Sequence, residues 1–215
     1  MRLMGQGPSR LTPHLCSQCH AHASRHLGGA EVELTMLFAD IRGSTPLAEK
    51  MAPAEFGRLI SRFFATASEV ITDSQALLDR LVGDQVIGLY IPGFAGAEHR
   101  ALAIQAAQDL LHVTGHGPTT EPWIPVGIGV HTGVAFVGSV GNAGIATDIT
   151  VLGDAPNTAA RLSSNAAAGE ILISEDAYVP DMNLEGLEKR QLTLKGKSNP
   201  VNVYVMKEIG NKDEL

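Results

Sequence analysis

The sequence predicts an α+β domain in which helices pack on a central, mostly antiparallel sheet. Two patterns predict it: apolar residues alternate in several short segments, as in strands, and recur every three or four residues in longer ones, as in amphipathic helices. The chain has 215 residues, of which 44% are hydrophobic and 18% charged. This supplies one sizeable core and too little charge for general disorder. Two full-sized enzymatic domains would not fit.

The first strand is expected to end at Asp40, because Leu34, Met36 and Phe38 alternate ahead of it. A helix is expected next, since apolar residues then recur at intervals of three and four. Its apolar stripe predicts that it lies across the sheet. The residues of this stripe are Phe56, Leu59, Ile60, Phe63, Ala67, Val70 and Ile71.

Shorter patterns predict the rest of the core. Two apolar runs flank Gly83-Asp84-Gln85, which is typical of a tight hairpin. The expected elements are strands over 76–82 and 86–91, a helix over 97–113, and strands over 126–131 and 134–140, the last two joined by a glycine turn. The order strand, helix, strand, strand, helix, strand is the ferredoxin-like βαββαβ arrangement.

This topology brings two acidic residues together. The first and third strands are antiparallel neighbours at the centre of such a sheet, so Asp40 is expected beside Asp84, in the turn that opens the third strand. Two neighbouring carboxylates repel each other unless a cation lies between them, and oxygen ligands of this kind select Mg²⁺ or Mn²⁺. The alternative is that each aspartate only caps a turn.

A phosphate-binding loop is predicted next to this pair. Gly43, Ser44 and Thr45 follow Asp40 and lead into a helix. A helix N-terminus with small residues offers backbone N–H groups and a positive dipole end to a phosphate. A metal and a phosphate would then be adjacent.

Five ordered segments resemble the class III nucleotidyl cyclase catalytic domain, and the resemblance covers about residues 31–207. They read FADIRGST at 38–45, RLVGDQV at 80–86, VGIGVHTG at 126–133, TVLGDAPNTAARL at 150–162 and LKGKSNPVNVY at 194–204. The resemblance implies that the ferredoxin-like core is extended to the class III cyclase fold. It also implies the conversion of a nucleoside triphosphate to its 3′,5′-cyclic monophosphate and pyrophosphate.

The resemblance assigns roles residue by residue. It implies that Asp40, Asp84 and the main-chain carbonyl of Ile41 hold two Mg²⁺ or Mn²⁺ ions per active site, which activate the ribose 3′-hydroxyl and stabilise charge on the α-phosphate. It implies that Asn157 orients the ribose and that Arg161 stabilises the developing phosphate charge. From its spacing alone Arg161 could be an ordinary helix-surface cation, and the motif around it favours the catalytic role.

One further basic residue, Lys195, is assigned in the same way. Lys195 matches the residue of the family that contacts the terminal phosphates, whereas Lys197 would otherwise be a solvated surface charge. His131 is the single polar ring in an apolar strand, and we expect it to be a satisfied structural histidine.

The residues that would read the base depart from the family pattern. Adenylate cyclases of the family typically use a lysine and an aspartate, and the matching positions here hold Arg80 and Thr150. A threonine hydroxyl can accept as well as donate a hydrogen bond, but the planar guanidinium of Arg80 suits adenine N1 and also the O6 and N7 edge of guanine. ATP is therefore the expected preferred substrate, with weaker discrimination than a lysine and aspartate pair would give.

The resemblance also implies a homodimer, because sites in this family form between two subunits and this chain carries both sets of residues. The segment 141–148 resembles the dimerisation arm of the family. The alternative for it is an ordinary flexible hairpin tip.

The two ends differ from the catalytic domain. Residues 1–30 are expected to be a flexible N-terminal segment, and residues 208–215 a polar C-terminal tail. Cys16 and Cys19 lie close together with His20, His22 and His26 nearby, so a metal-binding or redox role is an alternative to an incidental pair.

The predicted function is a cytoplasmic adenylate cyclase. The formal net charge of −7 disfavours a nucleic-acid-coating protein, and no apolar stretch is long enough to cross a membrane. Alternatives are a guanylate or dual-specificity cyclase and a catalytically degenerate cyclase homology domain that binds nucleotide for regulation. A diguanylate cyclase is disfavoured because the hairpin reads VGDQV rather than GGDEF.

Overall fold

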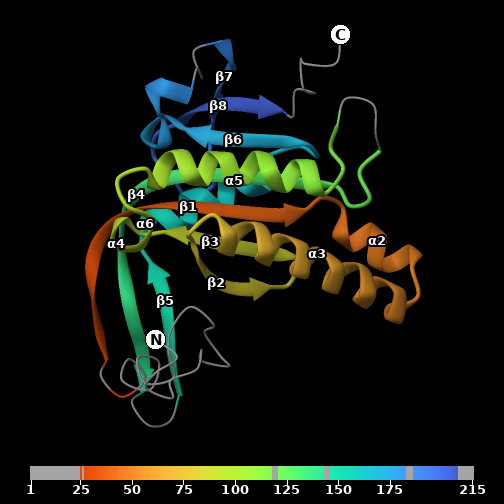
Figure 1. Ribbon diagram of the computed structural model, residues 1–215, viewed down its shortest axis with the longest axis horizontal. Coiled ribbons are helices and arrows are strands. Elements are labelled where there is room, and N and C mark those ends of the chain that lie inside the picture. Colours follow the sequence, from red (N-terminus) through yellow and green to blue (C-terminus); the bar gives the residue numbers. More distant parts are fainter. Residues whose placement is uncertain (1–24, 26, 118–120, 143–145, 183–185, 208–215) are drawn as a thin grey trace.

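The chain is organised around one mixed sheet. In the residues that the computed structural model describes, namely 25, 27–117, 121–142, 146–182 and 186–207, the sheet has eight strands in the order β2-β3-β1-β4-β6-β8-β7, with β5 paired to β4 beside this path (Figure 1). The strands are β1 Gly28–Ile41, β2 Leu77–Val82, β3 Gln85–Tyr90, β4 Val126–Asn142, β5 Ala146–Leu152, β6 Glu170–Ser174, β7 Glu188–Leu192 and β8 Val201–Lys207. The helices are α2 Ser44–Lys50, α3 Pro53–Asp73, α4 Pro92–Ala95, α5 His99–Val113 and α6 Asp154–Asn165, with 3-10 turns at Glu175–Ala177 and Pro180–Met182.

The first four strands have the ferredoxin-like arrangement that the sequence predicts. β1 lies at the centre and pairs antiparallel with both β3 and β4, and β2 pairs antiparallel with β3. β6 then adds to β4 as a parallel neighbour, and β8 and β7 continue antiparallel beyond it. The predicted fold class, α+β with a mostly antiparallel sheet, is confirmed.

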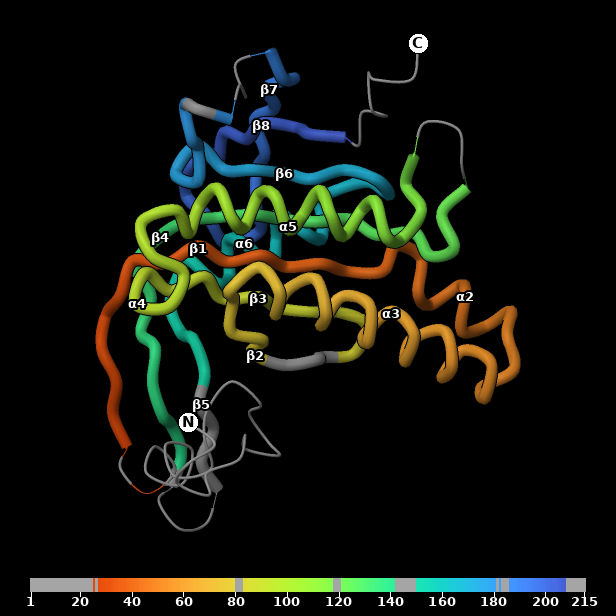
Figure 2. The backbone as a smooth tube through the Cα atoms, viewed as in Figure 1, coloured from red at the N-terminus to blue at the C-terminus, as the bar shows by residue number. Residues whose placement is uncertain are grey.

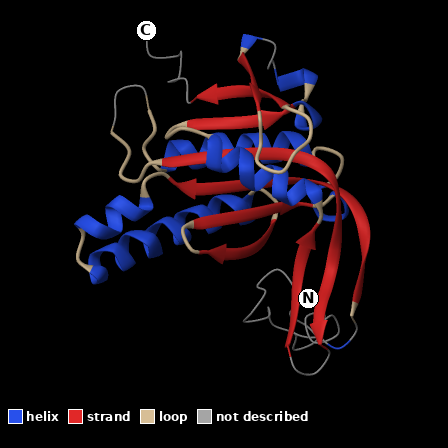
Figure 3. Ribbon diagram, turned by 180° about the vertical axis from the view of Figure 1, so that it is seen from behind, coloured by secondary structure: helices blue, strands red, loops and turns tan. Residues whose placement is uncertain are grey.

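Helices cover both faces of the sheet. α3 and α5 lie on one face, and α6 lies on the other (Figures 1 and 3). The alternation of β1 explains this, because Leu37, Ala39 and Ile41 pack with the α3 and α5 side, whereas the intervening residues pack with α6. The residues of β1 on the α6 side are Leu34, Met36 and Phe38.

The predicted glycine turn near residue 133 is wrong, because β4 runs unbroken from Val126 to Asn142. The glycine has a packing role instead. A Cβ at Gly133 would lie 2.9 Å from the Cβ of Ala155 in α6, so its absence lets the helix approach the strand. A glycine that a sequence presents as a turn can equally mark a close approach.

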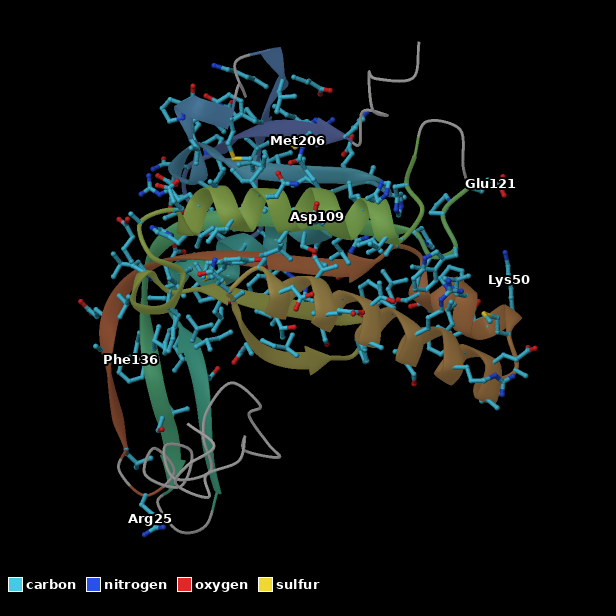
Figure 4. All side chains as sticks on the ribbon, in the orientation of Figure 1. Arg25, Lys50, Asp109, Glu121, Phe136 and Met206 are labelled. Carbon is cyan, nitrogen blue, oxygen red and sulfur yellow. The ribbon has the colours of Figure 1, made fainter. Side chains whose placement is uncertain are left out.

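The distal halves of β1 and β4 form an arm together with β5. Gly28 pairs with Ser139, and Phe136 pairs with Leu152 of β5. The three strands extend away from the helices (Figure 2), and Phe136 marks the arm in Figure 4.

The chain ends are described only in part. β1 begins at Gly28, inside the segment 1–30 that was predicted to be flexible. Cys16, Cys19 and the nearby His20, His22 and His26 lie outside the described residues, as does the tail 208–215. Within the described part of the chain, no helix combines the length and apolar character needed to span a bilayer.

Candidate active site

Asp40 and Asp84 lie at the same end of two adjacent strands. Asp40 stands opposite Gln85 in the β1–β3 pairing, and the amide of Ile41 donates a 3.3 Å hydrogen bond to the carbonyl of Asp84. Asp84 follows Gly83, whose φ of 63° closes the β2–β3 turn. The structure therefore brings together the two acidic positions that the topology predicts.

Burial and the neighbouring residues Arg42 and Asp84 shift the pKa of Asp40. Burial raises the pKa of the Asp40 carboxyl above its ordinary value, the guanidinium of Arg42 partly offsets this, and the charge of Asp84 raises the pKa further. Arg42 forms an ion pair with Asp40, and its Nη1 donates a 2.9 Å hydrogen bond to the carbonyl of Ser164. The influence of Asp84 agrees with two carboxylates that lie near each other.

The predicted phosphate loop lies beside Asp84. Gly43 takes a φ of 68°, which turns the chain from β1 into α2. Ser44 and Thr45 then line an open cavity of about 450 Å³ together with Asp84 and, on its apolar side, Ile60. α2 has only seven residues, so its dipole is small, and it projects from the body of the domain to Lys50 (Figure 4).

A second cavity lies on the α6 side of the sheet. It has a volume of about 230 Å³, and Thr150 and Asn157 are among its lining residues, with Phe38 and Ile87 from the sheet. Asn157 lies in the first turn of α6, and its Nδ2 donates a 2.9 Å hydrogen bond to the carbonyl of Gly153. The two cavities share no lining residue.

Arg161 lies against the turn between β7 and β8. A Cβ built on Gly196 would come within 3.3 Å of Nη2 of Arg161. This places the guanidinium beside the backbone between Lys195 and Lys197. Lys195, which precedes Gly196 in this turn, is exposed.

Lys197 is not the solvated surface charge that the sequence suggested. Its Nζ forms an ion pair with Asp154, the first residue of α6, and its side chain is 21% exposed. A carboxylate in the first turn of a helix also complements the helix dipole. The ion pair thus joins the turn to the start of α6.

His131 is a buried structural histidine, as expected. It is 7% exposed, and its Nδ1 lies 2.8 Å from Oγ of Ser174. Burial lowers its pKa, and the charge of Lys197 acts in the same direction, while Asp176 and Asp154 oppose them. The neutral ring is the stable form in the fold.

Two of the predicted positions are described only in part. Arg80 belongs to β2, but its side chain lies outside what the structure describes, and the same holds for the side chains at 142–148 of the predicted arm 141–148. Sequence reasoning missed Asp79, which lines the second cavity, and the contacts of Arg42. Arg42 stands two residues after Asp40, and this spacing is compatible with a contact, whereas nothing in the sequence indicates that Asp79 lines a cavity.

The fold is that of a cyclase-type catalytic domain. The chain belongs to the family described as the adenylate and guanylate cyclase catalytic domain, which matches residues 30–208. An adenylate cyclase of Anabaena cylindrica is 32% identical over 184 residues, and adenylate cyclase 1 of Rhizobium meliloti is 29% identical over 193. The matches cover 81% and 84% of this chain, but it spans only 36% and 29% of these relatives.

Solved structures agree on the fold. The adenylyl cyclase CyaB from P. aeruginosa superposes with a TM-score of 0.71 at 24% identity, covering 88% of this chain and 100% of that one. The guanylyl cyclase Cya2 superposes with a TM-score of 0.72 at 25% identity, covering 88% and 98%. Similar structures therefore carry both adenylyl and guanylyl cyclase names.

Proposed function

We propose that this chain is the catalytic domain of an adenylate cyclase, which converts ATP to 3′,5′-cyclic AMP and pyrophosphate at sites shared by two copies of the chain. One observation carries the proposal: a single chain holds both groups of residues. Asp40 and Asp84 lie at the ends of the central strands, and Thr150, Asn157 and Arg161 lie on and just before α6. The named relatives are adenylate cyclases.

The first group suits two Mg²⁺ or Mn²⁺ ions. In the described residues no cluster of three or more His, Cys, Asp or Glu side chains is present, but the implied site needs only Asp40, Asp84 and the carbonyl of Ile41. These are hard oxygen donors, and the two carboxylates repel each other unless a cation lies between them. Such ions, when bound, lower the pKa of the ribose 3′-hydroxyl and offset charge on the α-phosphate.

The remaining chemistry is positioning and charge stabilisation by the chain itself. The 3′-oxygen forms a bond to the α-phosphorus as the bond to the pyrophosphate oxygen breaks, and the hydroxyl proton is released. Asn157 holds the ribose, and the guanidinium of Arg161 stabilises charge on the phosphate. Lys195 contacts the terminal phosphates, and the backbone at Gly43 to Thr45 lies beside the metal-binding pair.

Product analysis tests the reaction. The purified chain is incubated with ATP or GTP in Mg²⁺ or Mn²⁺, and the cyclic products are separated by chromatography. Asp40→Asn and Asp84→Asn should each lower product formation by at least about a hundredfold. Asp73→Asn, an exposed acid at the end of α3, is the matched control and should retain full activity. Full activity in either site variant would refute the assignment.

Mixing two inactive variants tests whether the site is shared. The two cavities have no residue in common, which supports a composite site. If so, Asp40→Asn mixed with Arg161→Ala should regain about a quarter of the wild-type rate, because random pairing gives one intact site in half of the dimers. A mixture that stays inactive would place each site within one chain.

A guanylate or dual-specificity cyclase is the second candidate. The similarity to the guanylyl cyclase Cya2 and the ability of an arginine at position 80 to donate to either purine favour it. Formation of cyclic GMP as the main product would support a guanylate cyclase. Nucleotide binding without any cyclic product would instead indicate a degenerate domain.

A further inference from the structure

The second cavity contains an acidic residue to which the proposed function gives no role. Asp79 lines it together with Thr150 and Asn157, over an apolar floor that includes Phe38 and Ile87. Among the described residues that line the cavity, Asp79 is the only one with a charged side chain. The cavity therefore has a carboxylate acceptor, a hydroxyl and an amide on largely apolar walls, which is the usual composition of a small-molecule site.

A β-bulge explains why Asp79 lies there. Leu78 pairs with Gly88 of β3, but Leu81 pairs with Val86. Two residues of β2, Asp79 and Arg80, thus stand opposite the single residue Ile87. A bulge of this kind changes the direction of a side chain locally and often lies next to a functional site.

The position of Ile87 indicates on which face of the sheet Asp79 lies. Ile87 packs in the same cluster as Phe38 and as Ala155 and Ala159 of α6. Asp79 is thereby presented toward the α6 side, where Thr150 and Asn157 lie. Residues of four elements, β1, β2, β3 and the β5–α6 segment, line this cavity.

We propose that Asp79 is a specificity-determining residue whose carboxylate accepts a hydrogen bond from the 6-amino group of adenine. The inference rests on the proposed function. An ionised carboxylate only accepts hydrogen bonds, so it pairs with an amino group and repels an oxo group at the same place. The adenine amino group has two hydrogens, and Asp79 and the hydroxyl of Thr150 together supply two acceptors.

The test compares ATP with purine riboside triphosphate, which lacks the 6-amino group. Wild type should prefer ATP in kcat/KM by about tenfold or more, and Asp79→Ala should reduce that ratio by about tenfold. Asp79→Asn, which keeps the shape and one acceptor oxygen, should fall between them. The ratio compares two substrates on the same variant, so a change in the folded fraction does not affect it. Asp73→Ala, six positions earlier and exposed, should leave the ratio unchanged.

Two kinetic results would overturn the inference. One is an unchanged ratio in Asp79→Ala. The other is a loss of GTP turnover that exceeds the loss of ATP turnover, which would mean that the carboxylate pairs with N1–H and the 2-amino group of guanine.

Binding separates this inference from the proposed reaction. If wild type forms no cyclic product from any nucleotide, the proposed function fails, and titration calorimetry with ATP and purine riboside triphosphate in Mg²⁺ still measures the dependence on Asp79. A preference for ATP that Asp79→Ala removes would support the inference alone. Equal binding of both nucleotides, or binding of neither, would overturn it.

Discussion

Arg42 connects the end of β1 to the end of α6 through its contact with Asp40. One side of the guanidinium pairs with the Asp40 carboxylate, and Nη1 donates to the carbonyl of Ser164 in the last turn of α6. The side chains of Arg42 and Asp40 are 22% and 19% exposed, so the pair is more protected than a surface ion pair. The metal-binding position of the proposed site is therefore held by a cation of the chain itself.

Replacing Arg42 should change the titration of Asp40. In Arg42→Met the burial and the charge of Asp84 remain while the cation is lost, so the pKa of Asp40 should rise further above its ordinary value. A carboxyl with a raised pKa in the fold destabilises it more as the pH increases, because the unfolded chain releases the proton first. The variant should lose about 1 to 2 kcal/mol of unfolding free energy near pH 7 and less near pH 4.

Carbon-13 NMR of the Asp40 carboxyl and urea unfolding at both pH values measure these effects. Lys50→Met, an exposed lysine at the end of α2, is the control and should change neither quantity. A loss of stability that is equal at both pH values would show that Arg42 acts through packing rather than through Asp40.

Gly129 limits how closely α6 can approach β4. A Cβ there would lie 2.3 Å from the amide nitrogen of Ser163 and 2.6 Å from the carbonyl oxygen of Ala159. Both are backbone atoms, so Gly129→Ala must shift the helix, and we expect a loss of about 3 kcal/mol or more together with reduced activity. Gly57→Ala is the matched control, since nothing lies within 4 Å of its Cβ in α3, and it should gain up to about 1 kcal/mol. Thermal unfolding of both variants tests these expectations. Unchanged stability in Gly129→Ala would mean that the helix is not held tightly to the sheet.

His131 should make stability depend on pH. Its pKa in the fold lies below the ordinary value of 6.5, so as the pH falls through that value the unfolded chain takes up a proton and the folded chain does not. Stability should therefore be full above about pH 7 and should decrease as the pH falls toward the lowered pKa. In His131→Asn the amide can replace Nδ1 in the contact with Ser174. The difference in unfolding free energy between wild type and this variant should decrease as the pH falls over this range. Urea unfolding at several pH values measures it, with the exposed His112→Asn as control, and a constant difference would contradict a neutral buried ring.

Lys195 and Lys197 should have different roles, the first in binding ATP and the second in holding the turn to α6. Lys195 is exposed and precedes Gly196, whose backbone lies against Arg161, and we expect Lys195→Met to raise the KM for ATP by about tenfold. The amine of Lys197 is engaged by Asp154, so Lys197→Met should affect KM less and cost under about 1 kcal/mol of stability. Steady-state kinetics and urea unfolding of the two variants separate the roles. A larger KM effect for Lys197 would reverse the assignment of the phosphate contact.

The sequence predicted the core well where a pattern has one structural meaning. The stripe from Phe56 to Ile71 became α3, with Phe63, Ala67 and Ile71 buried, because helical periodicity over this length has no competing explanation. The position of Asp84 beside β1 followed from topology alone. The metal, substrate and dimer roles of these residues remain predictions.

Other features depend on contacts that sequence spacing does not contain. Gly133 accommodates Ala155 rather than forming the predicted turn, and a glycine in a sequence is compatible with both. The place of Asp79 depends on a bulge, which is a mismatch between two strands rather than a property of either. The pairing of Lys197 with Asp154 joins residues 43 positions apart and needed the packing of α6 to be known.

The continuity of β4 restricts how this chain can change in length. From Val126 to Ser139 every residue of the strand is paired with β1, so no loop along that stretch can absorb an extra residue. Inserting one residue there would turn the residues of β4 beyond it to the opposite face unless a bulge forms, whereas inserting two would preserve their faces. Homologues in which this stretch of β4 is longer or shorter by an odd number of residues should therefore carry a β-bulge in β4 or β1, as β2 does at Asp79 and Arg80.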